Sequence, residues 1–137
     1  MGWQTAQTSE KNVTPRDYFF LSSHKFPQRG SFLEGWEVIS TETFYQHGLV
    51  AICFVNTDIR HVVIAFQMFD EIQITQDCLD YARDFVKHAK QLAQRLDYKV
   101  SYTGKLKGGT VAELCAIQDK LLCYTFDSES IDESKLL

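Results

Sequence analysis

Between two glycines of this sequence, a leucine flanked by two lysines stands at the position where a serine would be a nucleophile. Residues 104–108 read Gly-Lys-Leu-Lys-Gly, between a predicted short strand at 100–103 and a helical pattern that begins at Gly108. A G-x-S-x-G frame between a strand and a helix holds its serine on a sharp turn with the hydroxyl oxygen exposed. Here Leu106 takes the serine's position, and its side chain has no nucleophilic or ionisable group. The segment predicts the backbone of a nucleophilic site without the nucleophile.

The same turn offers a second kind of chemistry, because the start of a helix presents backbone N–H groups and a favourable dipole to an anion. The candidate anion-binding residues are Lys105, Lys107, Gly108, Gly109 and Thr110. The Gly-Lys-Ser/Thr order of a phosphate-binding loop is missing. We favour the alternative in which the two lysines keep an exposed turn soluble, while Leu106 fills the space of the missing nucleophile.

Other reactive side chains do not form a site in the sequence. Cys115 is expected to face the core from the helix after the turn, and Ser101 lies on the strand before it, so no nucleophile–base pair can be named. His88 is expected at the surface or at the boundary of the apolar face of its helix. No C-x-x-C pair is present, and the histidines show no ligand spacing with the cysteines, so we expect no metal and no cofactor. We expect free, buried thiols at Cys53, Cys78, Cys115 and Cys123.

Composition restricts the class of protein. The 137 residues are 45% hydrophobic and 23% charged, which is typical of one soluble globular domain. The net charge of -4 argues against non-specific nucleic-acid binding, so no nucleic-acid partner is expected. No apolar run reaches the length of a transmembrane segment. The polar residues 1–10 lack a signal core, which predicts a cytoplasmic or otherwise intracellular protein, with secretion by a non-classical route as the alternative.

The elements that position the turn follow from the hydrophobic pattern. An irregular N-terminal segment, residues 1–30, contains an apolar patch at 18–21 that predicts a short helix or turn packed on the domain. After a short extended piece at 34–39 come two apolar runs, 49–55 and 61–66. Turn residues separate these runs and predict an antiparallel hairpin. Both runs lack alternation, which predicts burial on both faces of the sheet.

From the second hairpin strand onward, helices and strands alternate. Residues 75–96 have the spacing of a long amphipathic helix, which Thr75 or Asp77 would cap. The next elements are a strand, a helix and an apolar strand at residues 100–103, 108–117 and 121–126. We therefore predict an α/β fold with a small, mainly parallel sheet of about four strands, an antiparallel hairpin and helices on both faces. This α/β core would span residues 31–127, with an acidic tail at 128–137.

This pattern resembles the core of class 3 (fungal-type) lipases over about residues 34–130. The likeness rests on the strand at 61–66, the long helix, the strand before the turn, and the helix that begins Gly-Gly-Thr. In that family the turn usually reads G-H-S-L-G-G, so Lys105 and Leu106 stand for its histidine and serine. Residues 67–69, Gln-Met-Phe, stand where the family has an R-G-T or R-G-S turn that helps to build the oxyanion hole.

The family's acid and base come after the strand at 121–126, whereas this sequence has no histidine after that strand. The resemblance therefore implies a truncated, partial α/β-hydrolase core that is catalytically inactive. Such a pseudoenzyme would act by binding or assembly, in a structural, regulatory or effector role. The alternative is an active or fragmentary lipid or ester hydrolase of the same family.

The last apolar strand bears on partners. In the family's sheet it is internal, but here it is expected at an edge, and an apolar edge invites pairing. We therefore expect a second copy of the chain, another protein or the tail to cover this strand, and a lipid or anionic ligand is a further alternative. The candidate interface residues are Leu121, Leu122, Tyr124 and Phe126.

Overall fold

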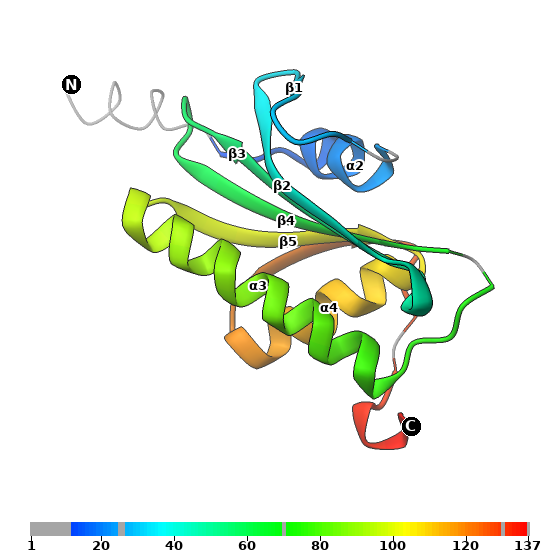
Figure 1. Cartoon of the computed structure of the whole chain (residues 1–137). Coiled ribbons are helices and arrows are strands. Elements are labelled where there is room, and N and C mark those ends of the chain that lie inside the picture. The colour runs from blue at the N-terminus through cyan, green and yellow to red at the C-terminus, as the bar shows by residue number, and fades with distance from the viewer. Residues whose placement is uncertain (1–11, 25–26, 70, 130, 137) are drawn as a thin grey trace.

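One six-stranded mixed sheet, covered by helices on both faces, forms the part of the chain that the computed structural model describes, residues 12–24, 27–69, 71–129 and 131–136 (Figure 1). The polar residues 1–10 lie outside that part. The helices are α2 (Pro15–Ser23), α3 (Gln76–Leu96) and α4 (Lys107–Asp119), with short 3-10 helices η1 (Tyr45–His47) and η2 (Glu133–Lys135). The strands are β1 (Phe32–Leu33), β2 (Trp36–Phe44), β3 (Leu49–Asn56), β4 (His61–Met68), β5 (Lys99–Lys105) and β6 (Leu122–Phe126).

The strands follow one another in the sheet in chain order. Neighbours from β1 to β4 pair antiparallel, and β4–β5 and β5–β6 pair parallel. The expected hairpin is therefore confirmed, and so is the parallel arrangement of the last three strands. The prediction of a mainly parallel sheet of about four strands is wrong. The piece expected at 34–39 extends through Phe44 as β2, because its polar, β-branched Ser-Thr-Glu-Thr stretch pairs with β3 while remaining partly exposed.

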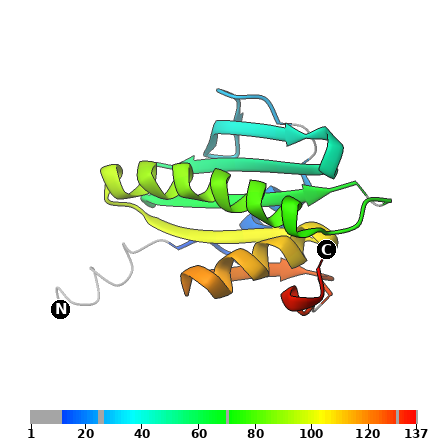
Figure 2. The same ribbon diagram turned by 60° about the horizontal axis from the view of Figure 1, so that its bottom comes forward.

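Helices α3 and α4 cover one face of the sheet (Figure 2). The Thr75 hydroxyl accepts a hydrogen bond from the backbone N–H of Cys78 at 3.1 Å, which confirms Thr75 as the cap of α3. At the far end of α4, Asp119 accepts a hydrogen bond from the buried Tyr102 of β5 and pairs with Lys90 of α3 at 3.1 Å. These polar contacts join α4 to β5 and α3 to α4.

The apolar patch at 18–21 lies in helix α2, as expected, and packs on the opposite face of the sheet (Figure 1). A capping box begins this helix, because Thr14 and Asp17 each bond the other's backbone N–H. Tyr18 and Leu21 are buried against a second apolar cluster that includes Trp36. Helix α2 therefore completes a three-layer arrangement around the sheet.

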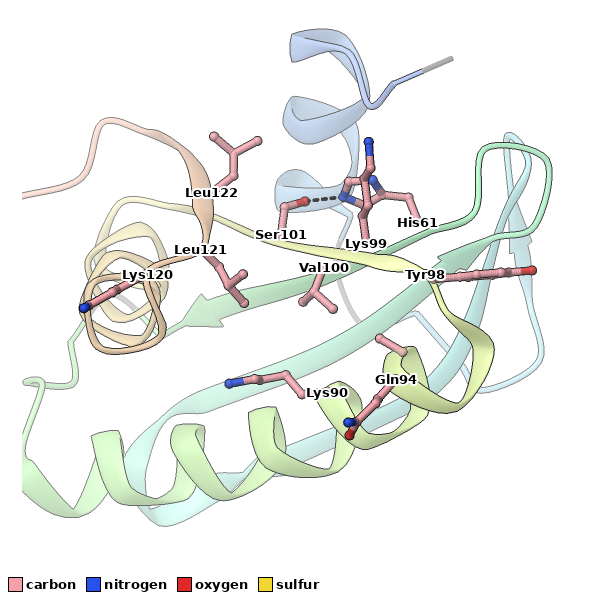
Figure 3. A pocket seen from close by; sticks show the side chains of 11 residues that line it. His61, Lys90, Gln94, Tyr98, Lys99, Val100, Ser101, Lys120, Leu121 and Leu122 are labelled. Carbon is pink, nitrogen blue, oxygen red and sulfur yellow. Dashed lines mark hydrogen bonds between the residues drawn. The ribbon is translucent and has the colours of Figure 1, made fainter. Parts of the chain in front are cut away.

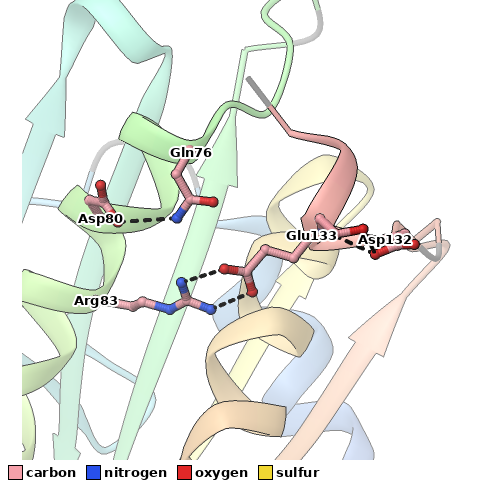
Figure 4. Close-up of polar contacts among 6 residues, drawn as sticks. Gln76, Asp80, Arg83, Asp132 and Glu133 are labelled. Atoms are coloured by element: carbon pink, nitrogen blue, oxygen red, sulfur yellow. Dashed lines mark hydrogen bonds and ion pairs between the residues drawn. The ribbon is translucent and has the colours of Figure 1, made fainter.

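The described part of the C-terminal segment lies against α3 (Figure 4). The Arg83 guanidinium donates to both carboxylate oxygens of Glu133, at 2.8 and 2.9 Å. Leu136 packs against the cluster between the sheet and α3. Within the described residues, no helix is both long and apolar enough to cross a membrane.

Candidate functional site: a strained turn and a buried polar chain

A single residue, Leu106, connects strand β5 to helix α4. Its backbone angles are φ 55° and ψ -127°, a conformation that residues with a side chain rarely adopt and that concentrates at functional sites. Its N–H donates to the Phe126 carbonyl at 2.9 Å, and its own carbonyl accepts from the Thr110 N–H at 3.1 Å. The side chain is 48% exposed, so the expectation that Leu106 fills the nucleophile's space is wrong. The strained backbone turns the side chain outward instead.

Two glycines allow this turn to be so tight. A Cβ added to Gly104 would lie 2.4 Å from the Gly108 carbonyl oxygen. A Cβ added to Gly108 would lie 2.2 Å from the Phe66 carbonyl oxygen of β4. Both atoms belong to the backbone and cannot move aside easily. The glycine frame of residues 104–108 is therefore required by the close approach of α4 to β4 and β5.

The two lysines of the turn point to different neighbours. The Lys107 ammonium group donates to the Ile72 carbonyl at 2.8 Å, in the loop between β4 and α3. The Lys105 ammonium group lies 5.4 Å from the centre of the Phe19 ring of α2, within range of a cation–π contact. Each lysine thus holds a neighbouring element against the turn.

The remaining candidate anion-binding residues are the buried first turn of α4, residues 108–110. The Thr110 hydroxyl donates to the Glu129 carbonyl at 2.8 Å and accepts from the Glu129 N–H at 3.1 Å. The segment after β6 therefore lies against the start of α4. The anion site stays a prediction.

The segment at 67–69 supports the neighbouring elements. The Gln67 amide donates to the carbonyls of Ser22 and His24 at the end of α2. The Phe69 N–H donates to the Gly48 carbonyl at 2.9 Å. These contacts fix the end of β4 to α2 and to the turn before β3.

A buried Ser–His contact lies at the other end of the parallel strands, where the sequence analysis named no such pair. Figure 3 shows Ser101 and His61 together, with the Ser101 hydroxyl oxygen 2.8 Å from His61 Nε2. Tyr18 of α2 donates to the same Ser101 oxygen at 2.8 Å. The conclusion that no nucleophile–base pair could be named is therefore wrong. The signal was a polar residue in each of two apolar strands, but the register that joins them is not readable from one sequence.

The environment of this trio favours a neutral imidazole. Burial, assisted by the nearby Lys99 charge, lowers the pKa of His61 to about 4. A neutral ring can accept a hydrogen bond from the Ser101 hydroxyl at Nε2, while the Ser101 oxygen accepts one from the Tyr18 hydroxyl. The result is a directed hydrogen-bond chain that joins α2, β5 and β4.

The pair lacks three requirements of a reactive serine. Ser101 is fully buried, although a cavity of about 680 Å³ opens beside it between Leu122 and α3 (Figure 3). It lies in the middle strand of three, paired with β4 and β6, so its backbone forms no open oxyanion hole. Among the described residues, no carboxylate pairs with His61. These hydrogen bonds among Tyr18, Ser101 and His61 therefore hold α2 on the sheet.

The surroundings of the four cysteines disfavour the thiolate, which is the reactive form. Burial raises the pKa of Cys53, Cys115 and Cys123 to about 12, and that of Cys78 to about 11. All four are free, as expected, and Cys115 faces the core as predicted, but Cys123 is only partly buried. His88 is exposed on α3, which confirms its expected position.

The candidate interface strand carries exposed apolar side chains. Leu122 is 61% exposed and Tyr124 39%, whereas Leu121 and Phe126 are partly buried. Tyr124 stacks on Tyr18 with ring centres 5.4 Å apart, and Phe126 meets Phe19 edge to face at 5.1 Å. The interface itself stays a prediction.

No protein-family model and no curated protein matches this sequence. Its structure is similar to the Rhizomucor miehei lipase in a propeptide complex, with a TM-score of 0.57, 16% identity, and coverage of 73% of this chain and 45% of that one. A lipase from Rhizopus microsporus var. chinensis gives 0.53 and 16%, covering 69% and 45%. A mutant form of MDLA from Penicillium cyclopium gives 0.53 and 16%, covering 90% and 58%.

These similarities concern the fold, since the identities are low. The chain spans about half the length of the solved structures that it matches. The six-stranded sheet with its flanking helices therefore has a lipase-like α/β fold.

Proposed function

We propose that this protein is a catalytically inactive lipase-like scaffold that acts by binding or assembly. The observation that carries the proposal is the turn at Leu106. There the backbone has the strained, outward conformation that presents a nucleophile, and the side chain presented is apolar. An exposed leucine can contribute contact area to a partner, but it cannot form a covalent intermediate.

The surroundings of the turn support a role in binding. Lys107 and Gln67 hold carbonyl groups of neighbouring elements, where an esterase would need donors directed at a substrate oxygen. Leu106 is also close to Phe126 through their backbone hydrogen bond, so the exposed turn continues into the apolar edge of the sheet. The scaffold therefore presents contact surface in the region where hydrolysis would require polar machinery.

A hydrolase is the second candidate, and the Ser101–His61 contact is the observation that favours it. A serine within 2.8 Å of an imidazole nitrogen is the start of a catalytic arrangement. Its burial and its place in the middle strand of three argue against substrate access. A longer polypeptide or a complementing chain would still contain leucine at the exposed turn, so completion of the fold alone would not supply that nucleophile.

The test is hydrolysis of a short-chain chromogenic ester, p-nitrophenyl butyrate, by the purified chain and by the Ser101→Ala variant. We expect both to match the rate of buffer alone, because neither has an accessible nucleophile. Hydrolysis by the native chain that a serine-directed phosphonate abolishes would contradict the proposal. Loss of that activity in Ser101→Ala would assign it to the buried pair.

A further inference from the structure

We propose that strand β6 pairs antiparallel with β6 of a second copy of this chain, with Tyr124 on the twofold axis. This inference rests on the proposed role in assembly and names the partner. It starts from the edge of the sheet, because β6 pairs with β5 on one side and with no described strand on the other. The strand reads Leu-Cys-Tyr-Thr-Phe and contains none of the lysines or prolines that commonly protect an edge.

The backbone of β6 fixes which groups are open. The Phe126 carbonyl accepts from the Leu106 N–H, and the Tyr124 carbonyl accepts from the Thr103 hydroxyl, so both carbonyls point toward β5. Because the direction of N–H and C=O groups alternates along a strand, those of Cys123 and Thr125 point outward. These two residues can supply the hydrogen bonds to an added strand.

Twofold pairing centred on Tyr124 uses both of these residues. Positions equally distant from Tyr124 then face one another, so Cys123 lies opposite Thr125 of the partner subunit in a hydrogen-bonded pair. Tyr124 lies opposite Tyr124 of the partner subunit in a non-hydrogen-bonded pair, where side chains approach most closely. Leu122, the most exposed side chain of the strand, lies opposite Phe126 of the partner subunit.

The charges at the ends of β6 favour the antiparallel direction. Lys120 precedes the strand, and Asp127 and Glu129 follow it, and all three are exposed. The chain leaves the strand at both ends, where Lys120 and Asp127 have positive φ, so antiparallel pairing brings the basic end of one β6 near the acidic end of the other without a fixed register between these side chains. A parallel partner strand would instead place the two basic ends together and the two acidic ends together. The strand is therefore self-complementary in charge as well as in backbone pairing.

The surroundings leave room for this partner. An open groove of about 530 Å³ follows the β6 edge and is lined by Phe19, Tyr124 and Phe126. The described part of the C-terminal segment adds no strand to β6, because Ser128 hydrogen-bonds to β6 only through the Thr125 side chain, at 3.2 Å, and Glu133 is held on α3 by Arg83 (Figure 4). The tail, at least in its described part, is thus not the cover for this strand that the sequence allowed.

The first arm of the test is light scattering during size-exclusion chromatography. We expect the native chain to have about twice the 15.8 kDa mass of one copy. Tyr124→Lys should be a monomer, because it brings two ammonium groups together on the axis. Phe32→Lys is the matched control, since Phe32 is 70% exposed on the opposite edge strand, β1, and this variant should remain a dimer. A monomeric native chain at high concentration, or a dimer that only Phe32→Lys dissociates, would overturn the proposal.

The second arm tests the register by disulfide formation in a Cys123→Ser background. Tyr124→Cys should give a covalent dimer on mild oxidation, because facing Cα atoms of a non-hydrogen-bonded pair are about 4.5 Å apart. Leu122→Cys should not, because it lies opposite Phe126 of the partner subunit. Cross-linking of the 122 variant, alone or together with the 124 variant, would overturn the antiparallel register centred on Tyr124.

The two arms are distinguishable from a failure of the proposed function. A monomer without ester hydrolysis would overturn the pairing of β6 and leave binding to another protein as the role. Ester hydrolysis would overturn the inactive scaffold, whatever the oligomeric state.

Discussion

The two ends of the parallel strands differ in how they combine geometry with chemistry. At the carboxyl end, the turn at Leu106 is strained and exposed, and it carries no reactive side chain. At the amino end, Ser101 and His61 have reactive groups in contact, but they are buried and oriented by Tyr18. Under the proposed function, neither the buried serine–histidine contact nor the strained turn is sufficient for catalysis. A catalytic site needs a reactive side chain at a position that substrate can reach.

The largest effect should come from the steric requirement of the turn. Gly108→Ala would place a Cβ 2.2 Å from the Phe66 carbonyl oxygen, so α4 would have to move away from β4. We expect the free energy of unfolding, measured in urea, to fall by about 3 kcal/mol or more, at the upper end of overpacking effects. The control is Gly109→Ala, whose new Cβ would lie 3.0 Å from the Ser128 side chain. An equal loss in both variants would contradict the special role of position 108.

At the other end, the pH dependence of stability should report the buried His61. Its pKa is lowered to about 4 in the folded chain, whereas an unfolded histidine titrates near its ordinary 6.5. Between these two pH values the unfolded chain binds more protons than the folded chain. The free energy of unfolding therefore has its highest value above about pH 6.5 and falls as the pH approaches 4. We expect His61 to lower the free energy of unfolding by about 2–3 kcal/mol over this pH range.

The measurement is urea unfolding at several pH values between 4 and 7, for the native chain and for His61→Gln. The difference between the two isolates His61 from Glu133, whose pKa is also lowered, by Arg83. The same pH slope in both proteins would show that His61 does not titrate as described.

Removal of the central hydroxyl of the trio should have a smaller effect. Ser101→Ala leaves the Tyr18 hydroxyl and His61 Nε2 without their shared partner in a buried space. We expect a loss of about 2 kcal/mol in the free energy of unfolding, because unpaired buried polar groups are costly. Tyr18→Phe should cost less, since Ser101 keeps His61. If Ser101→Ala were neutral, the chain of hydrogen bonds would not be what holds α2 on the sheet.

The smallest effect should be a gain in stability at the turn. Leu106→Gly removes a side chain that is nearly half exposed. It also relieves the backbone strain at this position, because glycine adopts a positive φ readily. We expect the free energy of unfolding to rise by about 0.5–1 kcal/mol. Leu106→Ala keeps a Cβ and should show little gain. A clear loss with glycine would mean that the leucine side chain contributes packing at this turn.

The sequence predicted those parts of the fold that depend on local patterns. The hairpin of β3 and β4, helix α3 with its Thr75 cap, and the order of the last strands all followed from apolar spacing. Strand β2 was underestimated because its polar Ser-Thr-Glu-Thr stretch becomes a strand only by pairing with β3. Local composition cannot show a partner that lies elsewhere in the sequence.

The site was less predictable, for two physical reasons. The glycine frame at residues 104–108 predicted a tight turn, but the backbone angles decide that Leu106 points outward. The contact between Ser101 and His61 depends on the register of two strands separated by a long helix. Neither a backbone angle nor a long-range register is encoded in the spacing of residue types along one sequence.

The most direct test of the central claim is covalent labelling of the native chain with a fluorophosphonate, read by intact-protein mass spectrometry. The reagent modifies an activated serine without needing a suitable substrate, so it tests the exposed turn and the buried pair together. We expect no adduct after prolonged incubation, because Leu106 cannot react and Ser101 is buried. A stoichiometric adduct that is absent from heat-denatured chain, and that maps to Ser101 or to any other serine, would contradict that expectation.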